Sequence, residues 1–262
     1  MENQAIEEAA QTIWSTWAAN RRIASLPTRC RPSSRADAYR IQAQVARLSA
    51  QKTYGWKIAA TSKAGQQHIG VDGPLAGRLL EKRAFASGAN VSLANNIMNV
   101  IEAEFAFRMA VDLPPRKTPY PTEEVIAAVA SMHPAIEIPD SRYQEFVSAG
   151  AAQLIADNAC ASYFVLGAAT VADWRQFDLA RHTVVAYVNG AVARDGKGEN
   201  VLGDPRIALT WIANELSLAG DMLRAGQIIT TGTCIAPAPV AAGDHVVADF
   251  GEFGRVEARM VE

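Results

Sequence analysis

The chain has 262 residues, of which 49% are hydrophobic and 20% charged, enough for the core of one large domain or two small ones. The formal net charge is −2 and the charges are interspersed, so nucleic acid is not an expected partner. The start lacks the positive and apolar regions of a signal peptide, and the most apolar segment, residues 151–172, is interrupted by Asp157 and Asn158, which excludes a membrane span.

The N-terminal region is predicted to be mainly helical. Apolar residues recur at helical spacing from residue 2 to about residue 21. Ser34 and Asp37 resemble a capping box that opens a second helix. A short strand is expected at TYGWKIAA, residues 53–60, followed by a helix-like segment, SKAGQQHIG, at residues 62–70.

Residues 81–262 are predicted to form a β-rich core on which the helical region, residues 1–80, packs in an α+β arrangement that can count as one domain. A clear strand is expected at about residues 97 to 109. The segment HPAIEIPDSR, residues 133–142, predicts a short strand that ends in a turn. Between these strands, TEEVIAAVASM predicts a helix with Thr122 as its N-cap.

The last third of the chain predicts two hairpins with a helix between them. Asn189 and Gly190 lie between two strand-like runs and give a strong hairpin signal. Asp204 is expected to cap a helix that begins with Pro205. A second hairpin is expected with its turn near Gly251.

Two glutamates, Glu102 and Glu104, lie in the otherwise apolar strand NVIEAEFAFRM. Because successive side chains on a strand point to opposite faces, both carboxylates share one face. The other face is a core face formed by Ile101, Ala103, Phe105, Phe107 and Met109. Same-face neighbours lie roughly 7 Å apart, and two carboxylates there repel by ~2 to 3 kcal/mol. Water, an arginine or a cation must therefore offset the repulsion.

A third acid, Glu137 in PAIEIPD, lies in a similar setting. Three carboxylates around one point would form a hard oxygen site suited to Mg²⁺ or Mn²⁺. Two other interpretations stay open, namely a solvated strand face and a structural ion network with Arg108 and Arg142. A glycosidase acid–base pair is less well supported, because nothing nearby suggests an aromatic sugar platform.

Other chemistries find little support. The four histidines form no short-range pair, and the sequence has neither a GxSxG elbow nor the GK[ST] of a phosphate-binding loop. The three cysteines, Cys30, Cys160 and Cys234, are far apart and odd in number. They predict buried thiols in a reducing cytoplasm and no disulfide framework.

Five motifs occur in a characteristic order along the chain. They are GWKIAATSKAGQQHIGVDGPLAGRL, IEAEFAF, HPAIEIPDSR, ADNACASYFVLG and a late TTGT. In this order the sequence resembles the 2-keto-4-pentenoate hydratase and 4-oxalocrotonate decarboxylase group of the fumarylacetoacetate hydrolase superfamily. The resemblance covers roughly residues 50 to 262 and implies a β-rich core in which sheets roll around the site.

The resemblance implies one divalent ion, Mg²⁺ or Mn²⁺, held by Glu102, Glu104 and Glu137, with Lys57 close to the substrate. Burial beside Trp56 predicts a lowered pKa for Lys57 and a role in proton exchange, without a Schiff base. The alternative for Lys57 is a plain salt bridge to one of the acids. Relatives that hydrolyse carbon–carbon bonds typically have an aspartate as third ligand and a His–Glu pair, which this chain lacks.

The implied activity is that of a metal-dependent lyase on small 2-oxo or 2-hydroxydienoic acids in aromatic catabolism, acting in the cytoplasm as a homo-oligomer. Hydration of the 2-hydroxypenta-2,4-dienoate type is expected first and 4-oxalocrotonate-type decarboxylation second. An acylpyruvate-type hydrolase and a non-catalytic metabolite-binding homologue are the remaining alternatives.

Four further residues are expected to contact the substrate: Thr231, Thr233, Asp140 and Cys160. The two threonines belong to TTGT, for which an ordinary glycine turn is the alternative. Cys160 follows Asn158-Ala159 where relatives often read DNASS, so a thiol replaces a hydroxyl that could contact the substrate. This departure puts the usual substrate in doubt.

Overall fold

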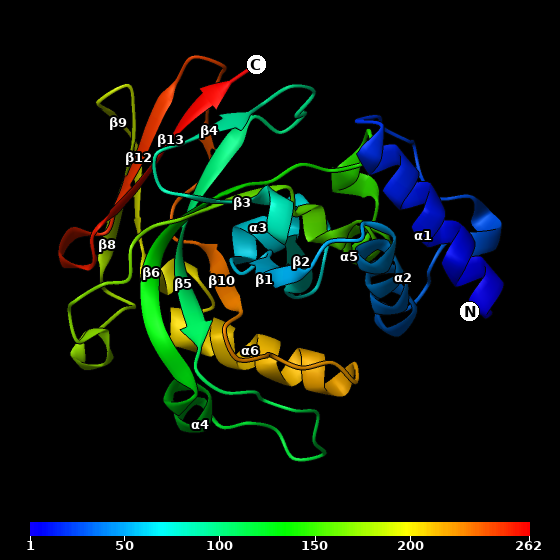
Figure 1. Cartoon of the computed structure of the whole chain (residues 1–262), viewed down its shortest axis with the longest axis horizontal. Coiled ribbons are helices and arrows are strands. Elements are labelled where there is room, and N and C mark those ends of the chain that lie inside the picture. Colours follow the sequence, from blue (N-terminus) through cyan, green and yellow to red (C-terminus); the bar gives the residue numbers. More distant parts are fainter.

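The N-terminal helices gather at one end of the molecule, and two β-sheets with the remaining helices form the rest (Figure 1). The computed structural model describes all residues, 1–262. The α-helices are α1 (Asn3–Ala18), α2 (Arg35–Leu48), α3 (Lys63–His68), α4 (Thr122–Ala127), α5 (Ala151–Ala156) and α6 (Pro205–Leu218). The strands are β1 (Thr53–Ala59), β2 (Leu75–Leu80), β3 (Ala84–Ala86), β4 (Ala89–Ser92), β5 (Val100–Met109), β6 (Val129–Ile138), β7 (Tyr163–Leu166), β8 (Thr183–Val188), β9 (Ala191–Lys197), β10 (Ile228–Thr233), β11 (Ala238–Pro239), β12 (His245–Asp249) and β13 (Arg255–Val261).

Both sheets are mixed, which confirms the predicted α+β fold. The eight-stranded sheet has the order β2-β1-β10-β5-β6-β7-β3, with β11 paired to β5, and the five-stranded sheet has the order β4-β13-β12-β8-β9. The pairs β1–β10, β3–β7 and β4–β13 are parallel, and the other neighbours run antiparallel. β1 and β2 fall within the expected helical region 1–80, so that region contributes two strands to the large sheet.

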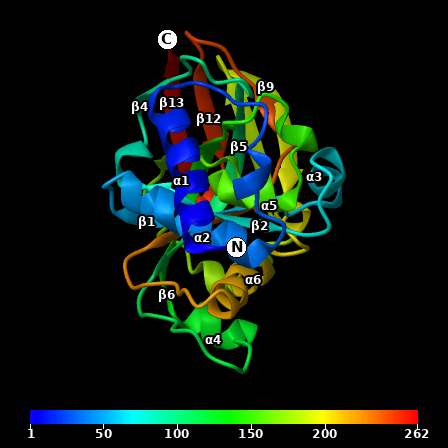
Figure 2. The same ribbon diagram turned by 90° about the vertical axis from the view of Figure 1, so that its right-hand side faces the viewer.

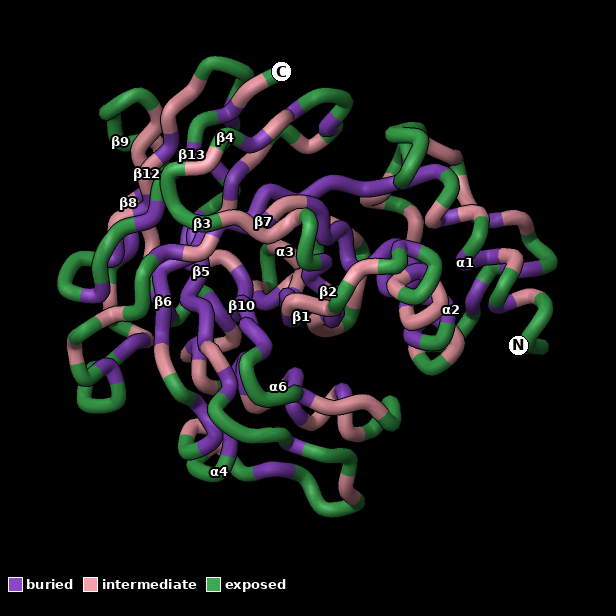
Figure 3. The backbone as a smooth tube through the Cα atoms, in the orientation of Figure 1, coloured by how far each residue is buried: buried purple, intermediate pink, exposed green.

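The predicted core face of β5 packs against the second sheet. Phe105 is fully buried, and its ring centroid lies 5.0 Å from that of Phe250 and 6.0 Å from that of Phe253. Most residues of the central strands β5, β6 and β10 are buried (Figure 3). The opposite face of β5, which carries the glutamates, is therefore turned away from the second sheet.

The helices α1 and α2 cover the end of the large sheet near β1 and β2 (Figure 2). Gln42 of α2 joins two elements there, because its side-chain amide donates to the carbonyls of Ala76 in β2 and Ile155 in α5, at 2.8 and 3.0 Å. No helix combines the length and the apolarity needed to cross a membrane.

Local signals in the sequence are confirmed at three of the four positions tested. Ser34 caps α2 by accepting from the Asp37 amide at 3.2 Å, and Asp204 caps α6. Asn189 and Gly190 both adopt positive φ, of 52° and 81°, as a tight two-residue hairpin turn requires. The prediction for Thr122 is wrong, because Pro121 is the N-cap of α4.

The segment after α4 is a strand where a helix was predicted. The helix α4 ends at Ala127 and β6 begins at Val129. Met132 pairs with Phe107 and Ser131 pairs with Arg108 along the β5–β6 ladder. Pairing with a central strand outweighs the weak helical preference of this short apolar run, so β6 has ten residues and carries Glu137 near its end.

Candidate metal and substrate site

The structure brings the three predicted acids together on one face of the large sheet. Glu102 on β5 lies directly opposite Glu137 on β6, and Glu104 follows two residues along β5. One carboxylate oxygen from each residue lies within 4.8 Å of the others. Glu104 and Glu137 are fully buried, whereas Glu102 is partly exposed and lines a cavity. This arrangement rules out a simple solvated face.

Lys57 reaches the same cluster from β1. Its Nζ lies 2.9 Å from Oε2 of Glu137 and donates to the Ala159 carbonyl at 3.0 Å. The side chain is only 3% exposed and also lines the cavity. The salt bridge to one of the acids is therefore present, and the expected role of Lys57 close to a substrate stays a prediction with which its position in the cavity wall is compatible.

The carboxylates carry more negative charge than Lys57 compensates. Burial first, and then the neighbouring Glu102, raise the pKa of Glu104, while Lys57 opposes the shift; together these effects bring the pKa to about 8. Burial also raises the pKa of Glu137, with Lys57 again opposing. For Lys57, burial lowers the pKa, but attraction to Glu137, Glu102 and Glu104 outweighs it and raises the pKa above its usual value. The expected neutral amine is therefore wrong for the protein without an ion, because three acids face one lysine.

The donor set fits a hard divalent cation. Oε1 of Glu104 and both carboxylate oxygens of Glu137 are buried and accept no hydrogen bond, although Oε2 of Glu137 forms the ion pair with Lys57. Three carboxylates and one ammonium leave two uncompensated negative charges, and buried unpaired charge is strongly unfavourable. A divalent ion would neutralise them and supply a partner for the orphaned oxygens. Mg²⁺ and Mn²⁺ prefer such oxygen ligands and keep other positions for water or substrate.

The residues that orient Glu104 come from β10 and were missed by the sequence analysis. The Thr230 hydroxyl donates to Oε2 of Glu104, and the Gly232 amide donates to the same atom at 2.8 Å. Thr231 is fully buried and donates to the Phe105 carbonyl at 2.9 Å, so its side chain does not reach the cavity. Strand alternation in TTGT was the available signal, since residues 230 and 231 must face opposite sides.

Thr233 and Cys160 do line the cavity. The Thr233 hydroxyl donates to the Ile235 carbonyl at 2.8 Å. Cys160 is 9% exposed and ends a run of three residues with positive φ, Asn158, Ala159 and Cys160, at 59°, 50° and 59°. Such backbone is costly for residues other than glycine and is found where surrounding contacts impose it, often at functional sites. This conformation aims the Ala159 carbonyl at Lys57.

Two buried interactions impose that conformation. The side chain of Asn158 accepts from the Arg78 amide and donates to the Arg78 carbonyl, both at 2.7 Å. Asp157 is fully buried, pairs with the guanidinium of Arg142 and accepts from the Ser141 hydroxyl at 2.7 Å. Arg142 is thus part of an ion network, as one interpretation of the sequence held, but its partner is Asp157 and not a metal-site glutamate.

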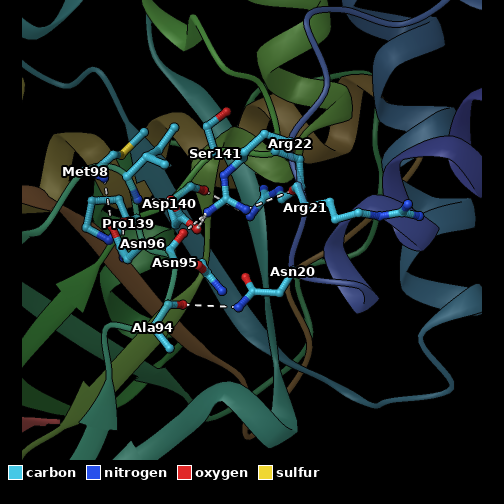
Figure 4. A network of polar contacts seen from close by, with 12 residues as sticks. Asn20, Arg21, Arg22, Ala94, Asn95, Asn96, Met98, Pro139, Asp140 and Ser141 are labelled. Atoms are coloured by element: carbon cyan, nitrogen blue, oxygen red, sulfur yellow. Dashed lines mark hydrogen bonds and ion pairs between the residues drawn. The ribbon is translucent and has the colours of Figure 1, made fainter. Parts of the chain in front are cut away.

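Asp140 lies behind the rim of the cavity and is not one of its lining residues. Figure 4 shows its carboxylate between Arg22, with which it forms an ion pair, and the backbone of the 94–99 segment. Its Oδ1 accepts from the Ile97 amide at 3.0 Å. In this structure Asp140 fixes the segment that lines the cavity, and the expected contact of Asp140 with a substrate stays a prediction.

The cavity has a volume of about 650 Å³, and 13 of its 23 lining residues are hydrophobic. Lys57 and Glu102 lie in its wall, together with apolar side chains from several segments. The cavity thus combines a charged end, where an acidic ligand and a cation could meet, with a large apolar remainder. This composition is typical of small-molecule sites.

Comparison with known proteins agrees with this fold. Residues 80–261 match the model of the fumarylacetoacetate (FAA) hydrolase C-terminal family. The 2-keto-4-pentenoate hydratase of Burkholderia vietnamiensis is 31% identical over 264 residues, covering 100% of this chain and 99% of that protein. The 4-oxalocrotonate decarboxylase of a Pseudomonas species is 33% identical over 231 residues, covering 86% of this chain and 85% of that protein.

A solved structure resembles the whole chain. The 4-oxalocrotonate decarboxylase from Pseudomonas putida G7, complexed with magnesium and adipate, superposes with a TM-score of 0.89 at 29% identity and covers 100% of this chain and 99% of that one. A mixed-sheet fold that carries three acids and a lysine at a cavity thus defines the class of protein. The chain belongs to the fumarylacetoacetate hydrolase family, and the resemblance to its hydratase and decarboxylase group is confirmed.

Proposed function

We propose that this protein is a metal-dependent lyase that hydrates small 2-hydroxydienoic acids, of the 2-hydroxypenta-2,4-dienoate type. The observation that carries the proposal is the cluster of Glu102, Glu104, Glu137 and Lys57 at the wall of one cavity. The glutamates would hold the ion, with Mg²⁺ or Mn²⁺ as its identity. When bound, the ion would act as a Lewis acid toward the carboxylate and 2-oxo oxygens of the substrate.

In this proposal Lys57 is the group that moves the proton. An ammonium has three N–H donors; Lys57 uses one in its hydrogen bond to the Ala159 carbonyl and turns another side toward Glu137 in the ion pair. The third is available to the cavity, where it can donate to the far carbon of the dienoate or orient the water that then adds. The fixed positions of both partners keep Nζ in place during the transfer, and a positioned acid–base group contributes about 10² to 10⁴ in rate.

Decarboxylation of the 4-oxalocrotonate type is the second candidate. It is supported by the 33% identical decarboxylase and by the TM-score of 0.89 to a decarboxylase structure. The same cluster serves either reaction, because both require stabilisation of negative charge that develops at the 2-oxo end of the substrate. We further propose that the protein acts as a homo-oligomer and that it is found in the reducing cytoplasm. The three free, buried cysteines support the proposed location.

The test is turnover of a panel of 2-hydroxydienoic and 2-oxo-enoic acids with Mg²⁺ or Mn²⁺, in which water addition and CO₂ release are detected separately. The proposal predicts metal-dependent water addition to 2-hydroxypenta-2,4-dienoate or a longer homologue. CO₂ release without hydration would establish the decarboxylase instead. No turnover of any panel member by a protein that binds the ion would support a non-catalytic homologue.

A further inference from the structure

The part of the cavity beyond the acid cluster is poor in positive charge. No arginine is among the lining residues, and Lys57 is the only lysine, already paired with Glu137. His68 also lines the cavity, and its ring packs edge-on against Phe146 with 6.2 Å between centroids. A ligand carboxylate far from the acid cluster would therefore find no fixed cationic partner.

The remainder of the cavity offers apolar contact to a longer ligand. Its volume of about 650 Å³ lies in the range of pockets that hold drug-sized molecules, so a five-carbon acid leaves much of it unfilled. The apolar lining includes Ile69 from the end of α3, Phe146, and Ile235 from the segment after β10. These side chains come from separate segments, so they surround the space and do not merely flank it.

The apolar rim is held in a defined position. Ile97 is 42% exposed, and both Ile97 and Met98 line the cavity. Asp140 accepts from the Ile97 amide at 3.0 Å, and Oδ1 of Asn96 accepts from the Met98 amide at 2.8 Å (Figure 4). Asn96 also donates to the Pro139 carbonyl at 3.0 Å, next to β6. The polar network thus fixes the backbone so that apolar side chains face the ligand.

From this arrangement we infer that the natural substrate is a monocarboxylic 2-hydroxydienoic acid with an uncharged, apolar tail, and that dicarboxylic analogues are rejected. The inference rests on the proposed function and specifies its substrate class. Three glutamates, Lys57 and a divalent ion sum to zero charge, so the first carboxylate of the substrate already makes the site negative. A second carboxylate would add negative charge in a largely apolar space whose polar lining residues, among them Thr61, Ser62 and Asn200, are uncharged. An alkyl tail would instead bury apolar surface.

The test is calorimetric binding of unreactive 2-oxo acids in the presence of Mg²⁺ at pH 8.5, where histidine is ordinarily neutral. 2-Oxohexanoate and 2-oxoadipate form a matched pair, because they have the same chain length and differ in a terminal methyl against a carboxylate. 2-Oxohexanoate should bind at least about tenfold more tightly. Affinity should rise about three- to fourfold for each methylene added from 2-oxobutanoate to 2-oxohexanoate. Equal or tighter binding of 2-oxoadipate would overturn the inference.

A pair of rim variants separates charge from size. Ile97→Arg adds a cation at an exposed position, so the variant should fold. The ratio of its affinity for 2-oxohexanoate to its affinity for 2-oxoadipate should be about tenfold or more smaller than in wild type. Ile97→Gln has a polar side chain without charge and should not narrow the preference to that extent. An unchanged preference in Ile97→Arg, or equal narrowing in both variants, would overturn the assignment of the preference to missing charge.

Failure of the underlying function has a different signature. If neither 2-oxobutanoate nor any longer 2-oxo acid binds in the presence of Mg²⁺ or Mn²⁺, the proposed function itself is wrong. If the short monocarboxylic acids bind with the ion but 2-oxoadipate binds equally well, only the inferred substrate class is wrong.

Discussion

Replacing Glu104 with glutamine should stabilise the protein without an ion and abolish its binding of divalent cations. The substitution Glu104→Gln removes a buried negative charge but keeps an oxygen that can accept from the Thr230 hydroxyl and the Gly232 amide. The new amide nitrogen takes the position of Oε1, which accepts no hydrogen bond in the structure. The variant therefore resembles the protonated form of the wild-type acid.

The expected gain in the free energy of unfolding follows from the raised pKa of Glu104. Folding moves this pKa from 4.5 to about 8, mainly through burial. A raised pKa contributes stability below pH 4.5 that is lost as the pH rises through 8. At about 1.4 kcal/mol per pH unit, the interval corresponds to at most roughly 5 kcal/mol. Glutamine does not ionise, so it avoids this loss, and the gain over wild type should be about 2 to 5 kcal/mol at pH 8.5.

The assay is urea unfolding in EDTA at pH 8.5 and at pH 4.5, with wild type and the exposed-site control Glu145→Gln measured in parallel. The gain in the free energy of unfolding should be present at pH 8.5 and nearly absent at pH 4.5, and the control should match wild type within about 0.5 kcal/mol. A Glu104→Gln protein that is less stable than wild type at pH 8.5 in EDTA would refute the reasoning.

Three further substitutions test separate parts of the account. Lys57→Ala should keep ion binding but lose turnover by a factor of about 10² to 10⁴. Borohydride added to wild type with substrate should label no lysine. Near-normal turnover of the variant, or a covalent adduct in wild type, would contradict this role. Asp157→Asn leaves a buried arginine unpaired and should lower the free energy of unfolding in urea by about 3 to 5 kcal/mol. The control Arg29→Gln changes an ion-pair partner that is 74% exposed and should lower it by under about 1 kcal/mol. Equal losses in the two variants would show that the buried pair has no special role in stability. Gly77→Ala would place a Cβ 2.2 Å from the backbone oxygen of Asn158 and should lower the free energy of unfolding by about 1 to 3 kcal/mol or more. In the control Gly73→Ala the added Cβ meets nothing within 4 Å, so no such loss is expected. An unchanged stability of Gly77→Ala would show that the turn can move freely.

The acid cluster was predictable because it depends on the shortest-range rule of sheet structure. Alternation along β5 places Glu102 and Glu104 on one face whatever the rest of the fold does. Glu137 was added from its similar setting in PAIEIPD and from the resemblance, but its position directly opposite Glu102 could not be predicted, since it requires the β5–β6 register. That register follows from pairing over the whole of β6, part of which was predicted as helix.

The misplaced residues all depend on long-range geometry. Thr231 was expected to contact the substrate and Thr230 was not singled out, because the face that β10 turns to the site is set by its pairing with β5 and by the irregularity before Thr233. The pKa of Lys57 is raised because three carboxylates from two other strands surround it, which neighbours in the sequence do not reveal. Asp140 looked like a site residue from its motif, but its direction depends on Arg22 in a distant N-terminal segment.

The central claim is that Glu102, Glu104 and Glu137 bind one divalent ion, and that a 2-oxo acid binds only when this ion is present. The most direct measurement is a calorimetric titration of Mg²⁺ and Mn²⁺ into wild type and Glu102→Gln, with and without 2-oxobutanoate. Glu102 is partly exposed, so its substitution should leave the fold intact. The account predicts one ion per chain in wild type, ion-dependent binding of the 2-oxo acid, and a loss of about 10-fold or more in ion affinity for the variant. No binding of either ion by wild type in any of these conditions, or equal affinity in the variant, would contradict it.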